Sequence, residues 1–255
     1  MEDNHYTPDW EFYIRNVDSK PGSIAVDLGL AEIAPVTTQP NLARISIRMI
    51  TPRPDGLPPL EETLTLQSIE DELDTELRVN HKATYAGRMT SNGRRNIYFY
   101  LDNAAPCAQT IAGVMQGYSD YVYDLRVEED KGWRRYFNFL YPEPEQLQSI
   151  KNRKVVDDLE KHGDNLNKER EVSHWVFFPS DADRAAFLSE VEQENFKVVY
   201  SDYDEGSGEY PFRLHISRKD KVDWAGIDKV VLWLSRQATK YNGEYDGWET
   251  AVQLG

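Results

Sequence analysis

Segments with strand-like and helix-like patterns alternate along this chain in an order that restricts its fold. In the second half, a leading helix over 145–161 is followed by strand, helix, strand, strand, helix and strand. The last helix, over 224–241, shows apolar residues at i, i+3, i+4 and i+7. This order is typical of the split βαβ, or ferredoxin-like, arrangement, in which two helices cover one face of a four-stranded antiparallel sheet.

The first half shows the same order from Leu42 onward. It is preceded by a hairpin over 10–30, for which we expect a turn at 18–22, and it is followed by an extra strand over 133–141. The fold class expected is therefore α+β, with two tandem ferredoxin-like (β-α-β-β-α-β) two-layer sandwiches, the first with an extra N-terminal hairpin. Prolines 142 and 144 mark the boundary, which predicts domains at 1–143 and 144–255.

Individual elements follow from local patterns. The helix over 66–79 places Glu70 with the other acids on an outer face, and Ser180 is an expected N-cap, with Asp183 three residues on. The helix over 224–241 is expected to be the longest. The remaining expected strands are 42–50, 83–89, 96–101, 121–129, 171–178, 196–203, 210–217 and the C-terminal stretch that contains 245–249, and the other expected helix is 104–116.

The charge of the chain favours a cationic partner. Its 255 residues carry 44 Asp and Glu against 29 Lys and Arg, a net charge of −15 that both halves share. A field of this sign repels phosphate backbones and attracts basic polypeptides. We therefore expect no direct nucleic-acid binding, although "GWRRYFNF" over 132–139 mixes arginines with aromatics as single-strand platforms do. The alternative for that stretch is a plain strand with Arg134 or Tyr136 outward.

The sequence shows no catalytic or metal-binding motif, so we expect no catalytic residues, no cofactor and no metal. Cys107 is the single cysteine, which excludes an internal disulfide. His174 and His215 are expected on neighbouring strands and would supply half a metal site at most. The stretch "DYDEGSGE" over 202–209 has glycine at the wrong position for an EF-hand loop and is better explained as a hairpin turn.

The first residues of the sequence and its hydropathy indicate the cellular compartment in which the protein acts. The opening "MEDNHYTPDW" lacks the basic and apolar regions of a signal peptide, and no apolar run approaches the roughly 20 residues that span a bilayer. A single cysteine fits a reducing compartment. We expect a cytoplasmic protein without membrane contact.

Aromatic and acidic residues of the second half are candidates for a protein-binding surface. Trp175 and Phe177 share one face of their strand, and that face is covered by the other domain, by another protein, or left partly wet. "EYDGWET" over 244–250 either binds a partner or forms a terminal strand whose role is structural. The candidate residues are Trp175, Phe177, Asp202, Asp204, Tyr245, Asp246, Trp248 and Glu249.

Three stretches together carry a resemblance to a known family. They are the "LEKHGD" ending of the connecting helix, "EVSHWVFFPSDADRAAF" over 171–187, and "YNGEYDGWET" over 241–250, of which 245–249 is the most specific. They resemble the regulator of ribonuclease E activity B family over 155–250. The first half resembles a bacterial domain of unknown function found fused ahead of this one. Better-known members of the regulator family carry a long acidic tail after the motif, whereas this sequence stops at Gly255.

The resemblance implies a non-enzymatic protein that binds ribonuclease E, or another basic, Arg-rich protein segment, and restrains RNA decay. Carboxylates would then replace phosphates on the nuclease's cationic segments. We expect a monomer or a weak homodimer. The alternative is an enzyme or small-ligand module with a carboxylate-lined site at the domain junction, formed by Asp202, Asp204 and Glu209.

Overall fold

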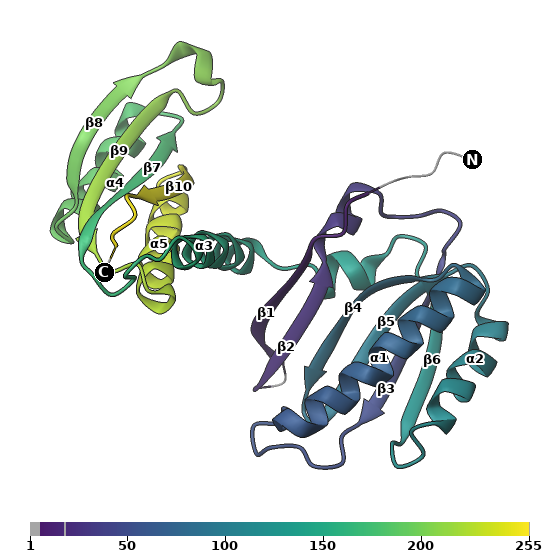
Figure 1. Ribbon diagram of the computed structural model, residues 1–255. Helices are drawn as coiled ribbons and strands as arrows, with labels where there is room; N and C mark the ends of the chain where they lie inside the picture. Colours follow the sequence, from purple (N-terminus) through teal and green to yellow (C-terminus); the bar gives the residue numbers. More distant parts are fainter. Residues whose placement is uncertain (1–5, 18, 255) are drawn as a thin grey trace. The chain divides into compact units, whose positions relative to one another are not determined.

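The computed structural model describes residues 6–17 and 19–254 (Figure 1). The chain divides into two compact units, Met1–Pro142 and Glu143–Gly255. Each unit contains one antiparallel sheet and its own helices. The mixed class of helices with two antiparallel sheets is therefore confirmed.

The first unit is built on a six-stranded sheet. Its strands lie in the order β1-β2-β4-β5-β3-β6, and all neighbours pair antiparallel. The hairpin of β1 and β2 adds to the edge at β4, since β2 pairs with β4. The bounds are β1 Trp10–Val17, β2 Lys20–Asp27, β3 Asn41–Arg48, β4 Thr84–Ser91, β5 Arg94–Leu101 and β6 Tyr123–Glu129.

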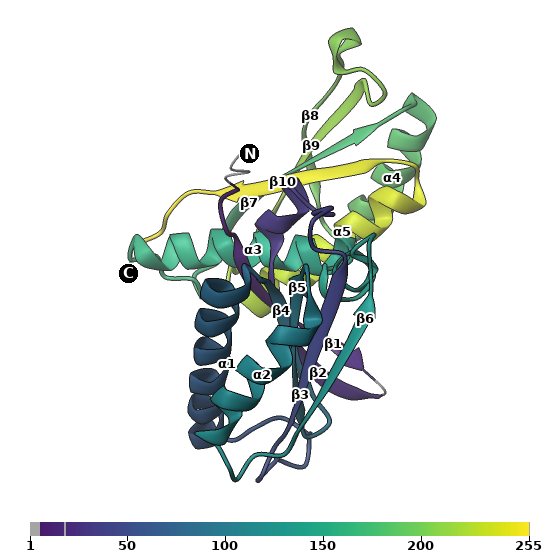
Figure 2. The same ribbon diagram turned by 90° about the vertical axis from the view of Figure 1, so that its right-hand side faces the viewer.

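Two helices, α1 (Leu60–His81) and α2 (Ala104–Gln116), cover one face of this sheet, as Figures 1 and 2 show. The side chain of Asn103 caps α2 by accepting a hydrogen bond from the backbone N–H of Ala105. Alternate residues of the strands pack against the helices because successive side chains of a strand point to opposite faces. This core includes Ile45, Ile47, Leu66, Ile69, Leu73, Ile97, Phe99 and Ile111.

Glu70 does not belong to the acidic outer face that the sequence predicts. Its side chain is 2% exposed and contacts Arg88 at 2.6 Å and Arg95 at 3.2 Å, while Tyr85 donates its hydroxyl hydrogen at 2.6 Å. Since Glu70 follows Ile69 by one position and precedes Leu73 by three, it lies at the margin of the buried stripe. The arginines on the strands then reach it across the packed layers.

The predicted strand over 133–141 is wrong. The segment forms a helical turn that continues into a π-helical stretch, η2 (Tyr136–Leu140). The reason is the carboxylate of Asp130, which accepts hydrogen bonds from the backbone N–H groups of Arg134 and Arg135 and so caps a helical turn. Trp133 adopts a positive φ of 49° at its start. Trp133 and Tyr136 are fully buried, whereas the strand prediction placed either Arg134 or Tyr136 outward.

The first hairpin turns earlier than predicted. Val17 pairs with Lys20, so Lys20, Pro21 and Gly22 already belong to β2. Of the two connecting residues, Ser19 takes a positive φ of 64°, and Asp18 lies outside the described residues. Pro21 lies inside β2, although proline has no N–H to donate to the hydrogen-bond ladder.

The second unit contains a four-stranded sheet in the order β10-β7-β9-β8, again antiparallel throughout. Two helices, α4 (Asp181–Gln193) and α5 (Trp224–Lys240), pack on one face of it. Ser180 caps α4 by accepting the N–H of Asp183, which confirms that prediction. The strands are β7 Arg170–Phe178, β8 Lys197–Tyr203, β9 Phe212–Asp220 and β10 Glu244–Thr250.

The leading helix α3 (Pro144–Lys161) packs against α5. Asn152, fully buried on α3, donates to the carboxylate of Asp228 at 2.8 Å and accepts the indole N–H of Trp248 at 3.0 Å. These bonds join α3, α5 and β10. The prediction that the helix over 224–241 is the longest is wrong, because α1 has 22 residues and α5 has 17.

Candidate protein-binding surface

The second sheet has a face that the helices of its unit do not cover. Along β7, Val172, His174, Val176 and Phe178 are buried toward the helices, and the intervening Trp175 and Phe177 point to the opposite side and stay partly exposed. This is the alternation that a two-layer sandwich requires. The two aromatics lie together on this face, in agreement with their spacing in the sequence.

Three rings form a line across this face. Trp175 pairs with His215 on β9, and the rings stack at 4.5 Å with an interplanar angle of 14°. Tyr200 on β8 pairs with the same histidine, and its ring lies edge-on at 5.0 Å. We call Trp175, His215 and Tyr200 the aromatic row. Such cross-strand aromatic pairs stabilise a sheet and make a flat, rigid platform.

His215 occupies the centre of the aromatic row in its neutral form. Burial lowers the pKa of the imidazole, and the nearby carboxylate of Glu249 opposes this shift only in part. Both ring nitrogens are buried and lack a hydrogen-bond partner among the described residues. A neutral ring between two aromatic rings adds apolar contact and no charge to the platform.

The edge strand β10 leaves open space beside Trp175. Gly247 pairs with Trp175, and a Cβ atom placed on this glycine would meet nothing within 4 Å. Two exposed carboxylates flank the gap along β10, because Glu244 pairs with Phe177 and Glu249 with Ser173. The indole is therefore approachable from its β10 side between two negative charges, an arrangement that suits a guanidinium or ammonium group.

Asp202 and Asp204 meet at the far end of β8 and share one arginine. Arg213 contacts Asp202 at 2.6 Å and Asp204 at 2.9 Å. The hydrogen bond from Arg213 lowers the pKa of Asp202, whereas hydrogen bonds from Ser207 and Gly206, helped by the charge of Arg213, lower the pKa of Asp204. Asp204 also accepts hydrogen bonds from Gly206 and Ser207 and so stabilises the turn after β8. Because Arg213 offsets one of their two charges, Asp202 and Asp204 together add one net negative charge beside the aromatic row. The sequence alone suggests two.

The terminal motif divides between the two faces. Tyr245 and Trp248 point toward the helices, where Trp248 is 9% exposed and the hydroxyl of Tyr245 lies 2.8 Å from Nδ1 of His174. Asp246 is exposed at a bulge, where β10 gains one residue relative to β7. Of the four candidate residues on β10, Glu249 is the one that shares the face of Trp175, since it pairs with Ser173. The structural role that the sequence offers as an alternative therefore suits Tyr245 and Trp248.

The structure brings together no metal ligands among the residues it describes. His174 and His215 lie on adjacent strands, but His174 pairs with Ile216 and points to the helices, whereas His215 points away from them. Burial lowers the pKa of His174 to about 3, and the charge of Arg218 adds to this effect. Cys107 is buried on α2 and burial raises its pKa, as expected for a packing residue.

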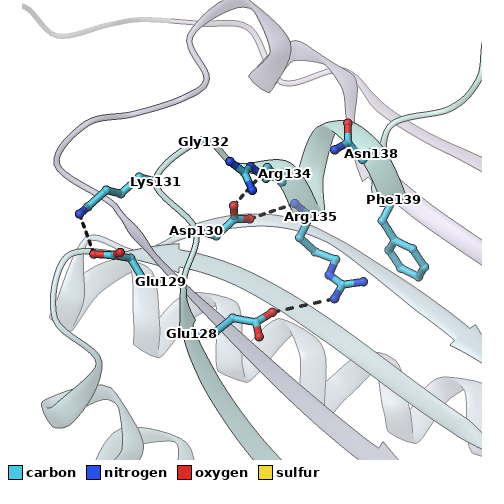
Figure 3. Close-up of a pocket in the computed structure, with 9 residues that line it drawn as sticks. All are labelled: Glu128, Glu129, Asp130, Lys131, Gly132, Arg134, Arg135, Asn138 and Phe139. Atoms are coloured by element: carbon cyan, nitrogen blue, oxygen red, sulfur yellow. Dashed lines mark hydrogen bonds and ion pairs between the residues drawn. The ribbon is translucent and has the colours of Figure 1, made fainter.

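The "GWRRYFNF" stretch of the first unit lines a hollow of about 570 Å³, drawn in Figure 3. Its charges are largely paired: Lys131 contacts Glu129 at 2.8 Å, and Arg135 approaches Glu128 at 3.9 Å. The guanidinium of Arg135 lies 4.9 Å from the ring centre of Phe139. The hollow has as many acids as bases, and Trp133 and Tyr136, two of the four aromatics in the stretch, are buried. It therefore lacks the features of a single-strand platform.

Sequence reasoning missed Tyr200, His215 and Gly247 as parts of this surface. The alternation of β8 and β9 indicates which residues share a face, but only the strand register brings His215 beside Trp175.

The described residues include no helix with the length and hydropathy needed to cross a bilayer.

Comparisons with known proteins divide the chain in two. Residues 8–141 match the family model described as "Family of unknown function (DUF695)", and residues 149–250 match "Regulator of ribonuclease activity B". Both matches agree with the resemblances found in the sequence. No curated protein matches the chain. A solved structure entitled "Crystal Structure of an Unknown Protein from Galdieria sulphuraria" is 13% identical, with a TM-score of 0.24, over 84% of this chain and 99% of that one.

Proposed function

Because this chain belongs to the family of unknown function (DUF695) and continues into a unit that matches the regulator of ribonuclease activity B, we propose that it is a non-enzymatic regulator of a ribonuclease. It acts by binding the nuclease through the helix-free face of its second unit. Ribonuclease E, or an Arg-rich segment of a similar nuclease in the cytoplasm, is the partner proposed.

The aromatic row is the observation that carries this proposal. Trp175, His215 and Tyr200 form a platform on a sheet face that the helices of the unit leave open, and Tyr200 is 43% exposed. Aromatic side chains of this kind dominate the energetics of protein interfaces. Glu244 and Glu249 beside the Gly247 gap then select an arginine of the partner, which stacks on the indole and pairs with a carboxylate.

A second proposal concerns the fold of the binding unit. The strand order β10-β7-β9-β8 with helices α4 and α5 on one face is what the ferredoxin-like arrangement requires. In the first unit, β4-β5-β3-β6 with α1 and α2 follows the same order. We infer two related sandwiches in tandem, of which the second binds the nuclease.

The test is an activity assay of purified ribonuclease E on a fluorogenic single-stranded RNA with increasing amounts of this protein. We expect saturable inhibition that weakens as salt rises, since screening reduces attraction between exposed charges. Trp175→Ala should raise the concentration for half-inhibition at least about tenfold, the size expected for a buried aromatic at an interface.

Trp224→Ala is the matched control. Trp224 is 49% exposed at the first position of α5, on the layer opposite the aromatic row, so its removal should leave inhibition unchanged. An unchanged cleavage rate at every concentration of the wild-type protein would reject the nuclease as partner. Equal losses from both tryptophan variants would reject the aromatic row as the interface.

A further inference from the structure

The helix-free face of the first sheet contains a polar hollow outside the part that η2 covers. Arg44 and Ser46 on β3 alternate with the core residues Ile45 and Ile47 and therefore point away from α1 and α2. Asn96 on β5 pairs with Ser46 and points the same way. Together with Arg94 and Asp124, these side chains line a hollow of about 370 Å³, a volume that suits a small molecule.

One buried polar atom in this hollow lacks a partner within the protein. Nε of Arg44 is buried and has no hydrogen-bond acceptor among the described residues. Asn96, which is 8% exposed, lines the same hollow. Buried polar groups in folded proteins are nearly always hydrogen-bonded, because leaving one unsatisfied costs about 1–3 kcal/mol.

The charges around the hollow leave one positive charge unbalanced. Arg94 donates to Asp124 at 3.0 Å and to Ser46 at 3.2 Å, so its charge is offset. Arg126 pairs with Glu128 at 3.0 Å. Arg44 lies directly opposite Arg126 in the ladder and has no carboxylate within 4 Å among the described residues. Like charges directly opposite each other destabilise a sheet unless an anion lies between them.

We propose that this hollow binds the carboxylate of a small molecule. The two oxygens of a carboxylate match the planar fork of Arg44, and the amide of Asn96 donates the remaining hydrogen bond. A single negative charge balances the single free guanidinium. A polyanion is disfavoured by Asp124 at the rim and by the net charge of −15.

The experiment is a ¹H–¹⁵N titration of the full chain that follows the Arg44 Nε–Hε and Asn96 side-chain amide signals. Acetate is the probe, acetamide is its neutral isostere, and sodium chloride keeps the ionic strength constant. We expect saturable shifts of both signals with acetate and none with acetamide. A peptide with a free C-terminus, compared with its amidated form, distinguishes a terminal carboxylate from that of a free metabolite.

Two variants test whether Arg44 and Asn96 bind the carboxylate. With two, the test does not depend on a single substitution that unfolds the protein. Arg44→Gln should raise the dissociation constant for acetate at least about tenfold, as expected for the loss of a charge-assisted pair. Asn96→Asp should abolish binding while the protein stays folded, because its own carboxylate pairs with Arg44. Arg48→Gln, four residues further along β3 and outside the hollow, is the control and should bind acetate as the wild type does.

Three results would overturn the proposal. One is a response to acetate that stays linear or equals that to chloride. Another is saturation by inorganic phosphate without saturation by any carboxylate. The third is an equal loss of affinity in Arg44→Gln and Arg48→Gln.

Discussion

The two sheets use their helix-free faces in different ways. In the first unit, Trp133 covers that face from the helical segment over 133–140 and stacks on Tyr100 at 3.9 Å with an interplanar angle of 6°. Its indole N–H donates to the backbone carbonyl of Gln39. In the second unit, Trp175 stacks on His215 of its own sheet and stays partly exposed.

A tryptophan on the helix-free face therefore stabilises the fold in the first unit, and in the second unit it is available to bind a partner. Trp133 is fully buried and bonded at its one polar atom, so it contributes to folding. Trp175 keeps part of its ring in water beside Gly247, where a partner gains by covering it. The difference depends on the chain after the last strand of each sheet. In the first unit that chain forms the covering segment, and in the second the described residues after β10 pair with the loop that precedes β7, where Leu254 bridges Asp164.

Truncation of the covering tryptophan should have the largest effect. Trp133→Ala should lower the unfolding free energy of the first unit by about 3–5 kcal/mol, since a large buried ring is lost and a cavity remains. Urea titration with amide signals assigned to each unit measures this. Trp175→Ala is the paired change and should cost the second unit about 1–2 kcal/mol. Equal losses would contradict the distinction between the two faces.

Acidic pH should lower the unfolding free energy of the second unit because of His174, which lies on the helix-covered face of its sheet. His174 has its pKa lowered to about 3 by burial, so it stays neutral in the folded state and gains a proton on unfolding below about pH 6.5. The unfolded state then binds more protons, and stability falls by about 1.4 kcal/mol per pH unit between pH 6 and 5. Urea midpoints across this window measure the slope, and His174→Phe should flatten it. An unchanged slope in that variant would place the acid sensitivity elsewhere.

The smallest change in stability should come from filling the gap beside Trp175. Gly247→Val should alter the unfolding free energy by no more than about 0.5 kcal/mol, because the new side chain meets open space and valine favours strands. Binding of the nuclease should nevertheless weaken, since the valine occupies the side from which a guanidinium reaches the indole. Calorimetric titration with an Arg-rich peptide, beside a thermal scan, separates the two effects. Tight binding by this variant would exclude approach from the β10 side.

Most of the secondary structure could be predicted from local chemistry. The helix starts at Asn103 and Ser180 follow from side chains that cap backbone N–H groups, and most strands follow from alternation of apolar and polar residues. The segment over 133–140 could not be predicted in this way. Its many aromatic residues favour a strand, but capping by Asp130 and stacking on Tyr100 favour a helical turn. Tertiary contacts override a weak local preference.

Some features of the candidate surface also follow from the sequence alone, and others depend on the tertiary structure. That Trp175 and Phe177 share a face is determined by their spacing of two, and the acidic character of the chain is a matter of composition. Which face stays open, and that His215 and Gly247 flank Trp175, depend on the pairing of β7 with β9 and β10. Strand register is fixed by the packing of residues far apart in the chain, so only the tertiary structure decided the composition of the aromatic row and the polar hollow.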